Sequence, residues 1–141
     1  MRRWIRNLAV GLPVRGEYVL ASLGGDRSTG VEFCRAIGGG IDFGETSDLA
    51  LRREFQEELG FDVEPTLLLG VMENLFEFEG MPGHEIVHVY AIESHEIDAL
   101  GLDADLTILD QGNPVRWYTR SQFKARKPPL YPEGILDLLP A

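Results

Sequence analysis

One stretch constrains the fold of this chain more than any other, because it joins a run of glycines to a helix that ends in carboxylates. It reads GGGIDFGETSDLALRREFQEELGFD and spans residues 38–62. Thr46, Ser47 and Asp48 offer an N-cap, and the residues from there to Leu59 are mostly good helix formers. Gly60 predicts the end of the helix. The sequence therefore predicts one helix with a glycine-rich segment before it and a glycine stop after it.

The helix carries three carboxylates on one turn. Glu54, Glu57 and Glu58 have the spacing i, i+3, i+4, which places them on one patch beside a row of apolar side chains. Like charges at i, i+4 cost roughly 0.2–0.5 kcal/mol per pair, and acids near the C-terminal end oppose the helix dipole. Arg53 relieves part of this cost by pairing with Glu57. Carboxylate oxygens are the ligands that Mg²⁺ or Mn²⁺ selects, although the three glutamates taken by themselves would favour a merely solvated acidic face. The apolar row consists of Leu51, Phe55 and Leu59.

The whole stretch resembles the signature of the Nudix (MutT-like) hydrolases, G-x5-E-x7-R-E-U-x-E-E-x-G-U, in which U is a bulky apolar residue. The resemblance implies an α+β fold, the α/β/α sandwich of that family with a mixed β-sheet flanked by helices, over a single domain of residues 1–141. Ile37 and Asp42 stand at undefined positions where many members carry proline and glutamate. The matching residues are Gly39, Glu45, Arg53, Glu54, Phe55, Glu57, Glu58, Gly60 and Phe61.

The resemblance also implies a reaction, which is the Mg²⁺- or Mn²⁺-dependent hydrolysis of the diphosphate bond in a nucleoside diphosphate linked to another group. It makes Glu54, Glu57 and Glu58 the expected metal ligands, with the carbonyl of Gly38 or Gly39 as a further oxygen. Arg53 would orient the carboxylates, and Glu45 and Gly60 would support the geometry of loop and helix. Glu54 or Glu57 is expected to accept the proton of water, unless an acid of the 94–105 loop does so. The acids of that region are Glu93, Glu96, Asp98, Asp103 and Asp105.

Substrate contacts are expected from fewer signals. Arg35, just before the glycines, is predicted to hold phosphate oxygens through paired hydrogen bonds, with a surface salt bridge as the alternative. Gly38 and Gly39 let backbone approach the substrate. Tyr131 is a candidate for stacking on a base or sugar, or else an ordinary packed tyrosine. His84 is a candidate to face the substrate groove, whereas His88 is expected to be packed and hydrogen-bonded.

The rest of the chain is richer in strands than in helices. Segments 8–14 and 18–23 predict a hairpin, and segment 31–37 predicts a strand that leads into the glycines. Segments 66–78 and 85–93 predict two strands joined by a turn, and 115–119 a short strand. A helical turn is expected from Ser121 and a short terminal helix over 131–139. Hairpin-linked strands favour a mixed sheet over a doubly wound parallel fold.

Charge and composition limit which kinds of partner and which cellular compartment the sequence predicts. The net charge is −10, and from Glu54 to Pro114 there are fifteen Asp or Glu residues and no Lys or Arg, which argues against a nucleic-acid polymer as partner. No apolar run is long enough to span a bilayer, and the one cysteine fits a reducing compartment, so a cytoplasmic protein is expected. A homodimer is expected from the resemblance alone. The alternatives are a Nudix-like module that senses a nucleotide without hydrolysis, and a prenyl diphosphate isomerase that would need a reactive Cys34.

Overall fold

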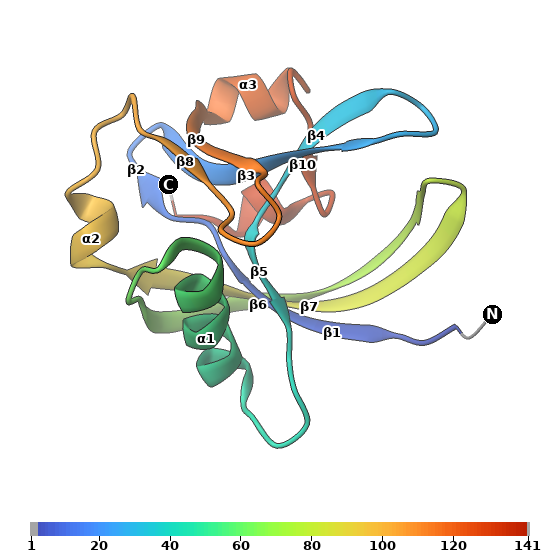
Figure 1. Cartoon of the computed structure of the whole chain (residues 1–141), viewed down its shortest axis with the longest axis horizontal. Helices are drawn as coiled ribbons and strands as arrows, with labels where there is room; N and C mark the ends of the chain where they lie inside the picture. The colour runs from blue at the N-terminus through green and yellow to red at the C-terminus, as the bar shows by residue number, and fades with distance from the viewer. Residues whose placement is uncertain (1–2, 141) are drawn as a thin grey trace.

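The chain forms two β-sheets that pack together at one end and splay apart at the other, with helices on both sides (Figure 1). The structure is a computed structural model and describes residues 3–140. The strands are β1 (Arg6–Gly11), β2 (Val14–Arg15), β3 (Tyr18–Asp26), β4 (Val31–Arg35), β5 (Ile37–Gly40), β6 (Glu64–Phe78), β7 (Met81–Glu93), β8 (Asp105–Thr107), β9 (Pro114–Thr119) and β10 (Leu130–Tyr131). The helices are α1 (Ser47–Leu59), α2 (His95–Asp98), α3 (Arg120–Lys124) and the 3₁₀ turn η1 (Ile135–Leu138).

The first sheet has the order β5-β1-β7-β6 and is mixed, since β1 runs parallel to β7 and antiparallel to β5. Its long hairpin, β6–β7, turns through only Glu79 and Gly80, so β7 begins earlier than the sequence predicts. The second sheet has the order β10-β4-β3-β9-β8, with the two residues of β2 paired to β3. The prediction of a mixed sheet flanked by helices is confirmed, although two sheets take the place of one.

Two predicted strands turn out to cross between the sheets. The segment predicted as one strand over 8–14 breaks at Leu12 and Pro13, so β1 lies in the first sheet and only β2 forms the predicted hairpin with β3. The segment predicted over 31–37 breaks at Ala36, so β4 lies in the second sheet and β5 in the first. Gly38, Gly39 and Gly40 are therefore strand residues paired with β1 rather than a free loop.

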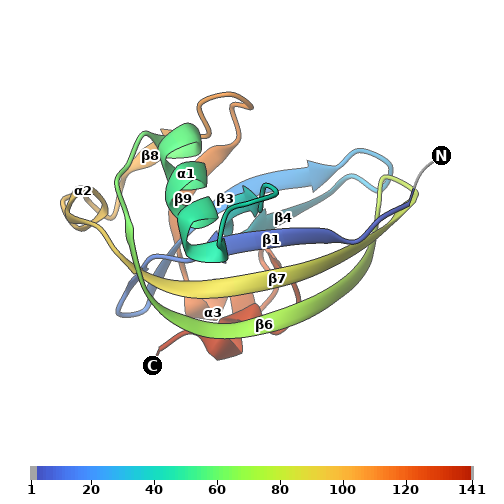
Figure 2. The same ribbon diagram turned by 90° about the horizontal axis from the view of Figure 1, so that it is seen from below.

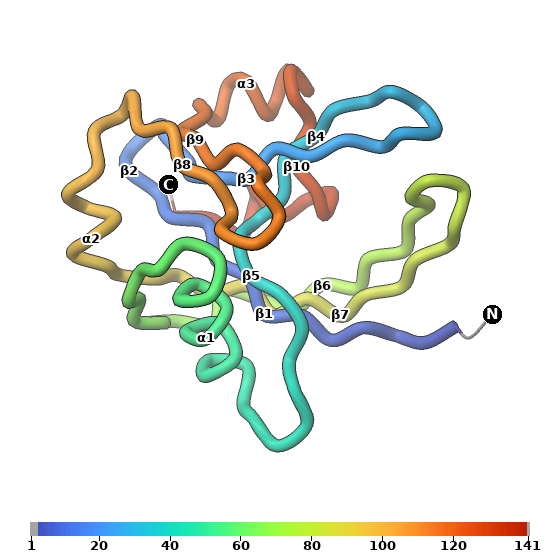
Figure 3. The backbone as a smooth tube through the Cα atoms, viewed as in Figure 1, coloured from blue at the N-terminus to red at the C-terminus, as the bar shows by residue number. Residues whose placement is uncertain are grey.

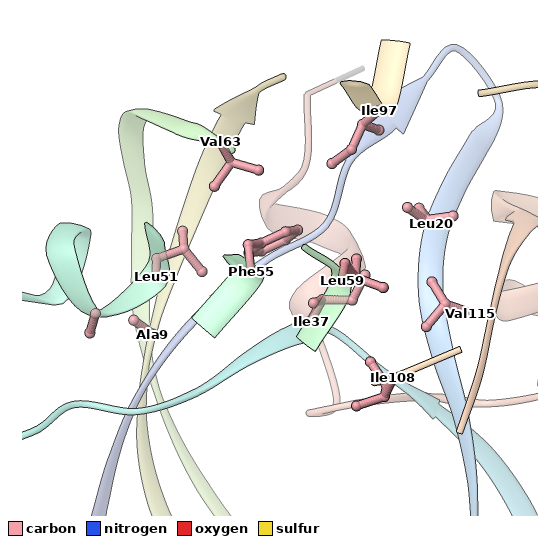
Figure 4. Close-up of a cluster of buried hydrophobic side chains, with 11 residues drawn as sticks. Ala9, Leu20, Ile37, Leu51, Phe55, Leu59, Val63, Ile97, Ile108 and Val115 are labelled. Carbon is pink, nitrogen blue, oxygen red and sulfur yellow. The ribbon is translucent and has the colours of Figure 1, made fainter. Parts of the chain in front are cut away.

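Two buried clusters hold these layers together. Phe55, Leu51 and Leu59 of α1 pack onto the first cluster, with side chains from both sheets (Figure 4). The second cluster lies between the sheets and the C-terminal segment, to which Phe123 and Ile135 contribute. Figure 2 shows α1 above the strands and the segment with α3 below them. The predicted apolar row of α1 is thus confirmed as its buried face.

The C-terminal prediction is partly wrong. Tyr131 belongs to β10 and pairs with Arg35 of β4, and only Ile135–Leu138 forms a helical turn. Pro132 lacks a backbone N–H, and Gly134 has φ +87°, outside the helical region, so the turn can begin only at Ile135. No helix within residues 3–140 has the length and the apolar content that a membrane crossing needs.

Candidate active site

A cleft of about 970 Å³ lies where the two sheets splay apart, and both sheets and α1 line it. The β3–β4 and β6–β7 hairpins project from the core in the same direction, while β5 and α1 lie at their base (Figure 3). The hairpin tips are joined, because the N–H of Glu79 donates to Asp26 Oδ2 at 2.9 Å and the N–H of Arg27 donates to Glu79 Oε2 at 3.1 Å. The cleft therefore extends from the carboxylates of α1 to a closed pair of turns.

The glycines of β5 bring backbone against the carboxylates of α1. A Cβ built on Gly39 would lie 2.6 Å from the Glu54 carboxylate, so only glycine leaves that carboxylate in place. Gly38 has φ +148°, and a Cβ there would lie 2.1 Å from the carbonyl oxygen of Ala9. Both glycines line the cleft together with Glu54, Glu57 and Glu58. The structure thus places the predicted metal ligands on one wall.

Arg53 ties the helix to the segment before it. Its Nε and Nη2 donate to the two oxygens of Glu45 at 3.2 and 2.6 Å, and Nη2 also donates to the carbonyl of Gly40 at 2.9 Å. Its Nη1 donates to Glu54 at 3.1 Å and to Glu57 at 3.3 Å. These bonds lower the pKa of Glu45 and raise that of Arg53, chiefly through the Arg53–Glu45 hydrogen bonds. Arg53 therefore fixes two of the three carboxylates.

Burial shifts the titration of the other groups on this wall. Loss of water raises the pKa of Glu58 to about 7, and the charge of Glu54 adds to the rise. Loss of water also raises the pKa of Glu54, although Arg53 opposes that shift. Removing carboxylates from water disfavours their charged form unless a cation compensates it. Glu54 and Glu58 are therefore placed where a cation would stabilise their ionised forms.

Four acids of the cleft were not predicted from the sequence, namely Asp26, Glu77, Glu85 and Asp110, and Asp110 is the one that acts on Glu58. Asp110 lines the cleft, and its charge contributes to the raised pKa of Glu58. Its loop is fixed, because the N–H of Leu109 donates to the carbonyl of Glu58 at 2.8 Å and Ile108 is buried. Asp110 lies more than fifty residues after the helix, so only the tertiary fold brings it there. No sequence pattern marks it among the other acids.

The opposite wall carries the predicted substrate residues Arg35 and Tyr131. Cζ of Arg35 lies 5.0 Å from the ring centroid of Phe33 and 5.2 Å from that of Phe78. The ring of Tyr131 meets that of Phe33 edge-on at 5.4 Å. This end of the cleft thus combines a cation with aromatic surface. Phe33 and Phe78 were not predicted as site residues.

Several predicted residues lie outside the cleft. His84 does not line it, because the alternation of β7 turns Glu85 inward and places His84 beside the exposed Leu75. His88 is packed as expected, with Nδ1 3.2 Å from the carbonyl of Leu8. None of the acids expected from the 94–105 region lines the cleft, and two of them have other partners. Glu96 accepts from the N–H of Asp62, and Asp105 pairs with Arg116.

Glu54, Glu57 and Glu58, together with the glycine strand, form what we call the acidic wall of the cleft. The atoms of this wall that could bind a metal ion are oxygens. Within residues 3–140, no three carboxylate, imidazole or thiol groups converge closely enough to enclose a metal ion. Instead, Glu54 and Glu57 are both held by Arg53. Glu58 and the backbone carbonyls of the glycine strand complete a hard donor set of the kind that Mg²⁺ or Mn²⁺ prefers.

Comparisons with known proteins agree with this geometry. A family model described as NUDIX domain matches residues 6–138. The chain is 30% identical over 109 residues to Nucleoside triphosphatase NudI of Enterobacter sp. (strain 638), an alignment that covers 74% of each protein.

Solved structures share the fold. A NUDIX hydrolase from Nitrosomonas europaea aligns with a TM-score of 0.64 at 17% identity, covering 96% of this chain and 86% of that one. The E. coli ORF135 protein aligns with a TM-score of 0.61 at 18% identity over 96% and 87% of the two chains. A MutT NUDIX hydrolase from Burkholderia pseudomallei gives 0.58 at 22% identity over 83% and 84%. By the family model and the NudI relative, the chain belongs to the NUDIX domain family and is a Nudix hydrolase.

Proposed function

We propose that this protein is a Mg²⁺- or Mn²⁺-dependent pyrophosphohydrolase that cleaves the diphosphate bond of a small nucleotide, a nucleoside diphosphate linked to another group. The observation that carries the proposal is the close approach of Gly39 to the Glu54 carboxylate, with Glu57 and Glu58 on the same wall of the cleft. The name of the NudI relative, a nucleoside triphosphatase, supports a nucleotide as substrate.

The donor set supports a divalent cation. Glu54, Glu57 and Glu58 would hold it, with a backbone carbonyl of Gly38 or Gly39 as a further ligand. The raised pKa of Glu58 fits this role, because no cationic side chain within residues 3–140 pairs with its carboxylate to offset its burial. A cation held by these residues would offset the charge of the diphosphate and lower the pKa of a bound water, which carboxylates alone cannot do.

The side chains of the chain position the substrate and accept a proton. Arg53 keeps Glu54 and Glu57 oriented toward the cleft through its bonds to Glu45 and Gly40. A carboxylate of the cleft accepts the proton of the attacking water. The candidates are Glu54 and Glu57 from the helix and Asp110 from the loop after β8. Catalysis then depends mainly on positioning and on stabilising charge.

Phosphate release tests the proposal. Nucleoside triphosphates, nucleoside diphosphate sugars and dinucleoside polyphosphates are each incubated with Mg²⁺ or Mn²⁺ and a coupled inorganic pyrophosphatase or phosphatase. Glu57→Gln and Glu58→Gln should each lower kcat by about 100-fold or more, since each removes a charge that the transition state needs. Glu17→Gln, at the exposed turn after β2, is the matched control and should leave kcat unchanged. Full activity in both helix variants would overturn the mechanism, and nucleotide binding without turnover of any compound would favour a sensing module.

A further inference from the structure

Two rows of polar side chains line the cleft beyond the acidic wall. Strand register places one row across β1, β7 and β6 and the other across β3, β4 and β10. Every member lines the cleft, although the neighbouring positions on these strands are mostly apolar. Arg6 and Arg35 are exposed and only Glu85 is buried, so the rows present accessible donors and acceptors to the open cleft, which suits a ligand with polar edges. The rows are Arg6, Glu85 and Asn74, and Ser22, Arg35 and Tyr131.

Glu85 supplies acceptors to this region. Its side chain is only 10% exposed, and one oxygen accepts from Asn74 Nδ2 at 3.3 Å while the other lies 3.7 Å from Arg6 Nη1. A carboxylate accepts about four hydrogen bonds, so these two neighbours leave part of its capacity unused. Glu85 is thus a buried, fixed acceptor beside the cleft.

Arg35 supplies donors. Its contacts with Phe33 and Phe78 restrict the plane of the guanidinium. Within residues 3–140, no protein oxygen accepts a hydrogen bond from this side chain, which carries five N–H donors. Arg35 also reaches the first sheet, because its Cζ lies 5.2 Å from the ring centroid of Phe78 on β6. Asn74 of the same strand donates to Glu85, and Arg35 and Glu85 line the same cleft. A donor edge and an acceptor edge therefore adjoin in one cleft.

We propose that Arg35 and Glu85 together recognise the lactam edge of a nucleobase, a carbonyl oxygen next to a ring N–H, so that oxo bases are preferred over amino bases. This inference rests on the proposed nucleotide hydrolysis. Guanine and hypoxanthine present this edge as O6 and N1–H, and uracil and thymine present it as O4 and N3–H. The bases that it disfavours are adenine and cytosine.

The chemistry of the two edges explains the preference. Arginine donates to the base carbonyl and the Glu85 carboxylate accepts the ring N–H, while Phe33, Phe78 and Tyr131 offer apolar surface to the base. In adenine and cytosine an amino group replaces the carbonyl and a bare ring nitrogen replaces the N–H. Donor would then meet donor and acceptor would meet acceptor, so the bound base would cover Arg35 and Glu85 without pairing with either.

This proposal assigns Arg35 to the base rather than to phosphate oxygens. Arg35 and Gly39 belong to different sheets, and the guanidinium of Arg35 lies against the rings of Phe33 and Phe78 rather than against the glycine strand. In the proposed arrangement, a nucleotide with its diphosphate at Glu54 presents its base, rather than its phosphates, to Arg35 and Glu85.

Two matched substrate pairs test the preference, because the members of each pair differ only at this edge. We expect kcat/KM to be about 10- to 100-fold higher for ITP than for ATP, and for UTP than for CTP. A preference confined to ITP over ATP would identify purines as the bases that reach the rows, and one confined to UTP over CTP would identify pyrimidines. Ratios near one in both pairs would overturn the proposal.

Variants then assign the preference to the residues. Glu85→Gln replaces an acceptor with a donor, and Arg35→Met removes the donors while keeping an apolar stem against the rings. Each should bring the ITP/ATP or UTP/CTP ratio to within about threefold of one. Glu73→Gln is the matched control, since Glu73 lies on neighbouring β6 opposite Ile86, outside the cleft, and should keep the wild-type ratio. A ratio is independent of how much of each variant folds, and an unchanged ratio in both cleft variants would overturn the assignment.

Binding of IMP, AMP, UMP and CMP, measured by calorimetry, separates the two proposals. If no nucleotide is hydrolysed and IMP still binds about tenfold more tightly than AMP, the base preference stands and the proposed hydrolysis fails. If all triphosphates are hydrolysed at equal rates and the monophosphates bind equally, the hydrolysis stands and the base preference fails.

Discussion

Single residues of the acidic wall have little freedom to change, and Gly39 is the clearest case. The Glu54 carboxylate occupies the space that a Cβ at position 39 would need, at 2.6 Å. At neighbouring Gly40, a Cβ would meet only Arg6 Nη2, at 3.9 Å. The two glycines lie in one strand, but of these two positions it is only at 39 that the surrounding space excludes a side chain.

Gly39→Ala should therefore lower kcat by about 100-fold, because the methyl group would displace the Glu54 carboxylate by about 1 Å. Gly40→Ala is the matched control and should retain kcat within about threefold. Steady-state kinetics with Mg²⁺ measures both, and circular dichroism checks the fold. Equal kcat in the two variants would contradict the role given to the Gly39–Glu54 contact.

The pH dependence of stability should report on Glu58. Its pKa is about 7 in the folded protein, against an ordinary value of 4.5. Between these two values the folded state binds the proton more tightly than the unfolded chain, so the contribution is present below about pH 4.5 and is lost as the pH rises through 7. Without divalent metal, the free energy of unfolding should fall by roughly 1–3 kcal/mol from this group between pH 5 and pH 8.

Urea denaturation in a chelating buffer at pH 5 and pH 8 measures this loss. Glu58→Gln cannot titrate, so its pH dependence should be flatter than that of the wild type by the same amount. Parallel pH profiles for the two proteins would show that Glu58 titrates normally.

Cys34 should be chemically inert. It is fully buried, and burial raises the pKa of its thiol to about 11 from 9.0. At pH 8.5 the thiolate fraction is then roughly 0.3%, too small for ready alkylation. Mass spectrometry after iodoacetamide treatment should show no modification of the folded protein and complete modification in urea. Rapid labelling of the folded protein would instead support a reactive Cys34, as the isomerase alternative requires.

At this scale, the sequence predicts what is local and misses what is distant. Glu45, Arg53 and the three glutamates lie within fifteen residues of one another, and helical spacing alone relates most of them. Asp110 and Glu85 come from other strands and loops, and their neighbours in the sequence do not distinguish them from solvated acids. His84 was the candidate to face the substrate groove, but the pleat of β7 turns its neighbour Glu85 inward instead.

At the scale of elements, the link between α1 and the strand before it depends on one side chain. Arg53 spans Glu45, Gly40, Glu54 and Glu57 with its three guanidinium nitrogens. A lysine retains the charge but presents a single nitrogen, so it cannot bond to all four groups at once. The orientation of the helix carboxylates therefore requires the fork of arginine.

Arg53→Lys should lower kcat by about tenfold or more while KM changes little, because the carboxylates lose orientation and not charge. Arg52→Lys is the control on the same helix, since Arg52 pairs with Glu64 away from the cleft. Kinetics at saturating nucleotide compare the two variants. A similar kcat in both would mean that charge alone suffices at position 53.

The helix was predicted with its correct end and a start within one residue of the observed one, whereas two strands were not. Capping residues and Gly60 mark α1 locally, and Gly60 indeed ends it with φ +71°. The crossings at residues 12–13 and at Ala36 leave no such mark, because an apolar strand that changes sheets keeps the same composition. Two packed sheets therefore look like one in the sequence.

At the scale of the whole molecule, the cleft is closed at both ends, by the core at one and by the hairpin tips at the other. Asp26 Oδ1 accepts three hydrogen bonds within its own turn, and Oδ2 accepts the N–H of Glu79 from the other hairpin. The hydrogen bond from Ser28, followed by that from Glu79, lowers the pKa of Asp26. One carboxylate thus shapes a turn and joins two sheets.

Asp26→Asn should break only one of the two hydrogen bonds between the tips, because the amide oxygen can keep the turn while its NH₂ faces the N–H of Glu79 and the bond from Arg27 to Glu79 remains. The Glu79 amide should exchange hydrogen about tenfold faster, with little change in Tm, since the tips are exposed. Ser28→Ala removes one bond of the turn and serves as control, with Glu79 exchange unchanged. Hydrogen exchange by NMR or mass spectrometry measures this, and unaltered exchange in Asp26→Asn would show that the tips are held by other contacts.

The crossing of the chain at Ala36 limits how such a protein can diverge. Arg35 and Gly39 sit on opposite walls of the cleft but are joined by three residues, and side chains along a strand alternate faces. Insertion or deletion of one residue between Arg35 and Gly39 would turn the cleft-facing side chains of one wall to the opposite face of their sheet, while those of the other wall stayed in place. Lineages descended from this chain can exchange side chains on either wall one at a time, but the number of residues between Arg35 and Gly39 must be inherited unchanged.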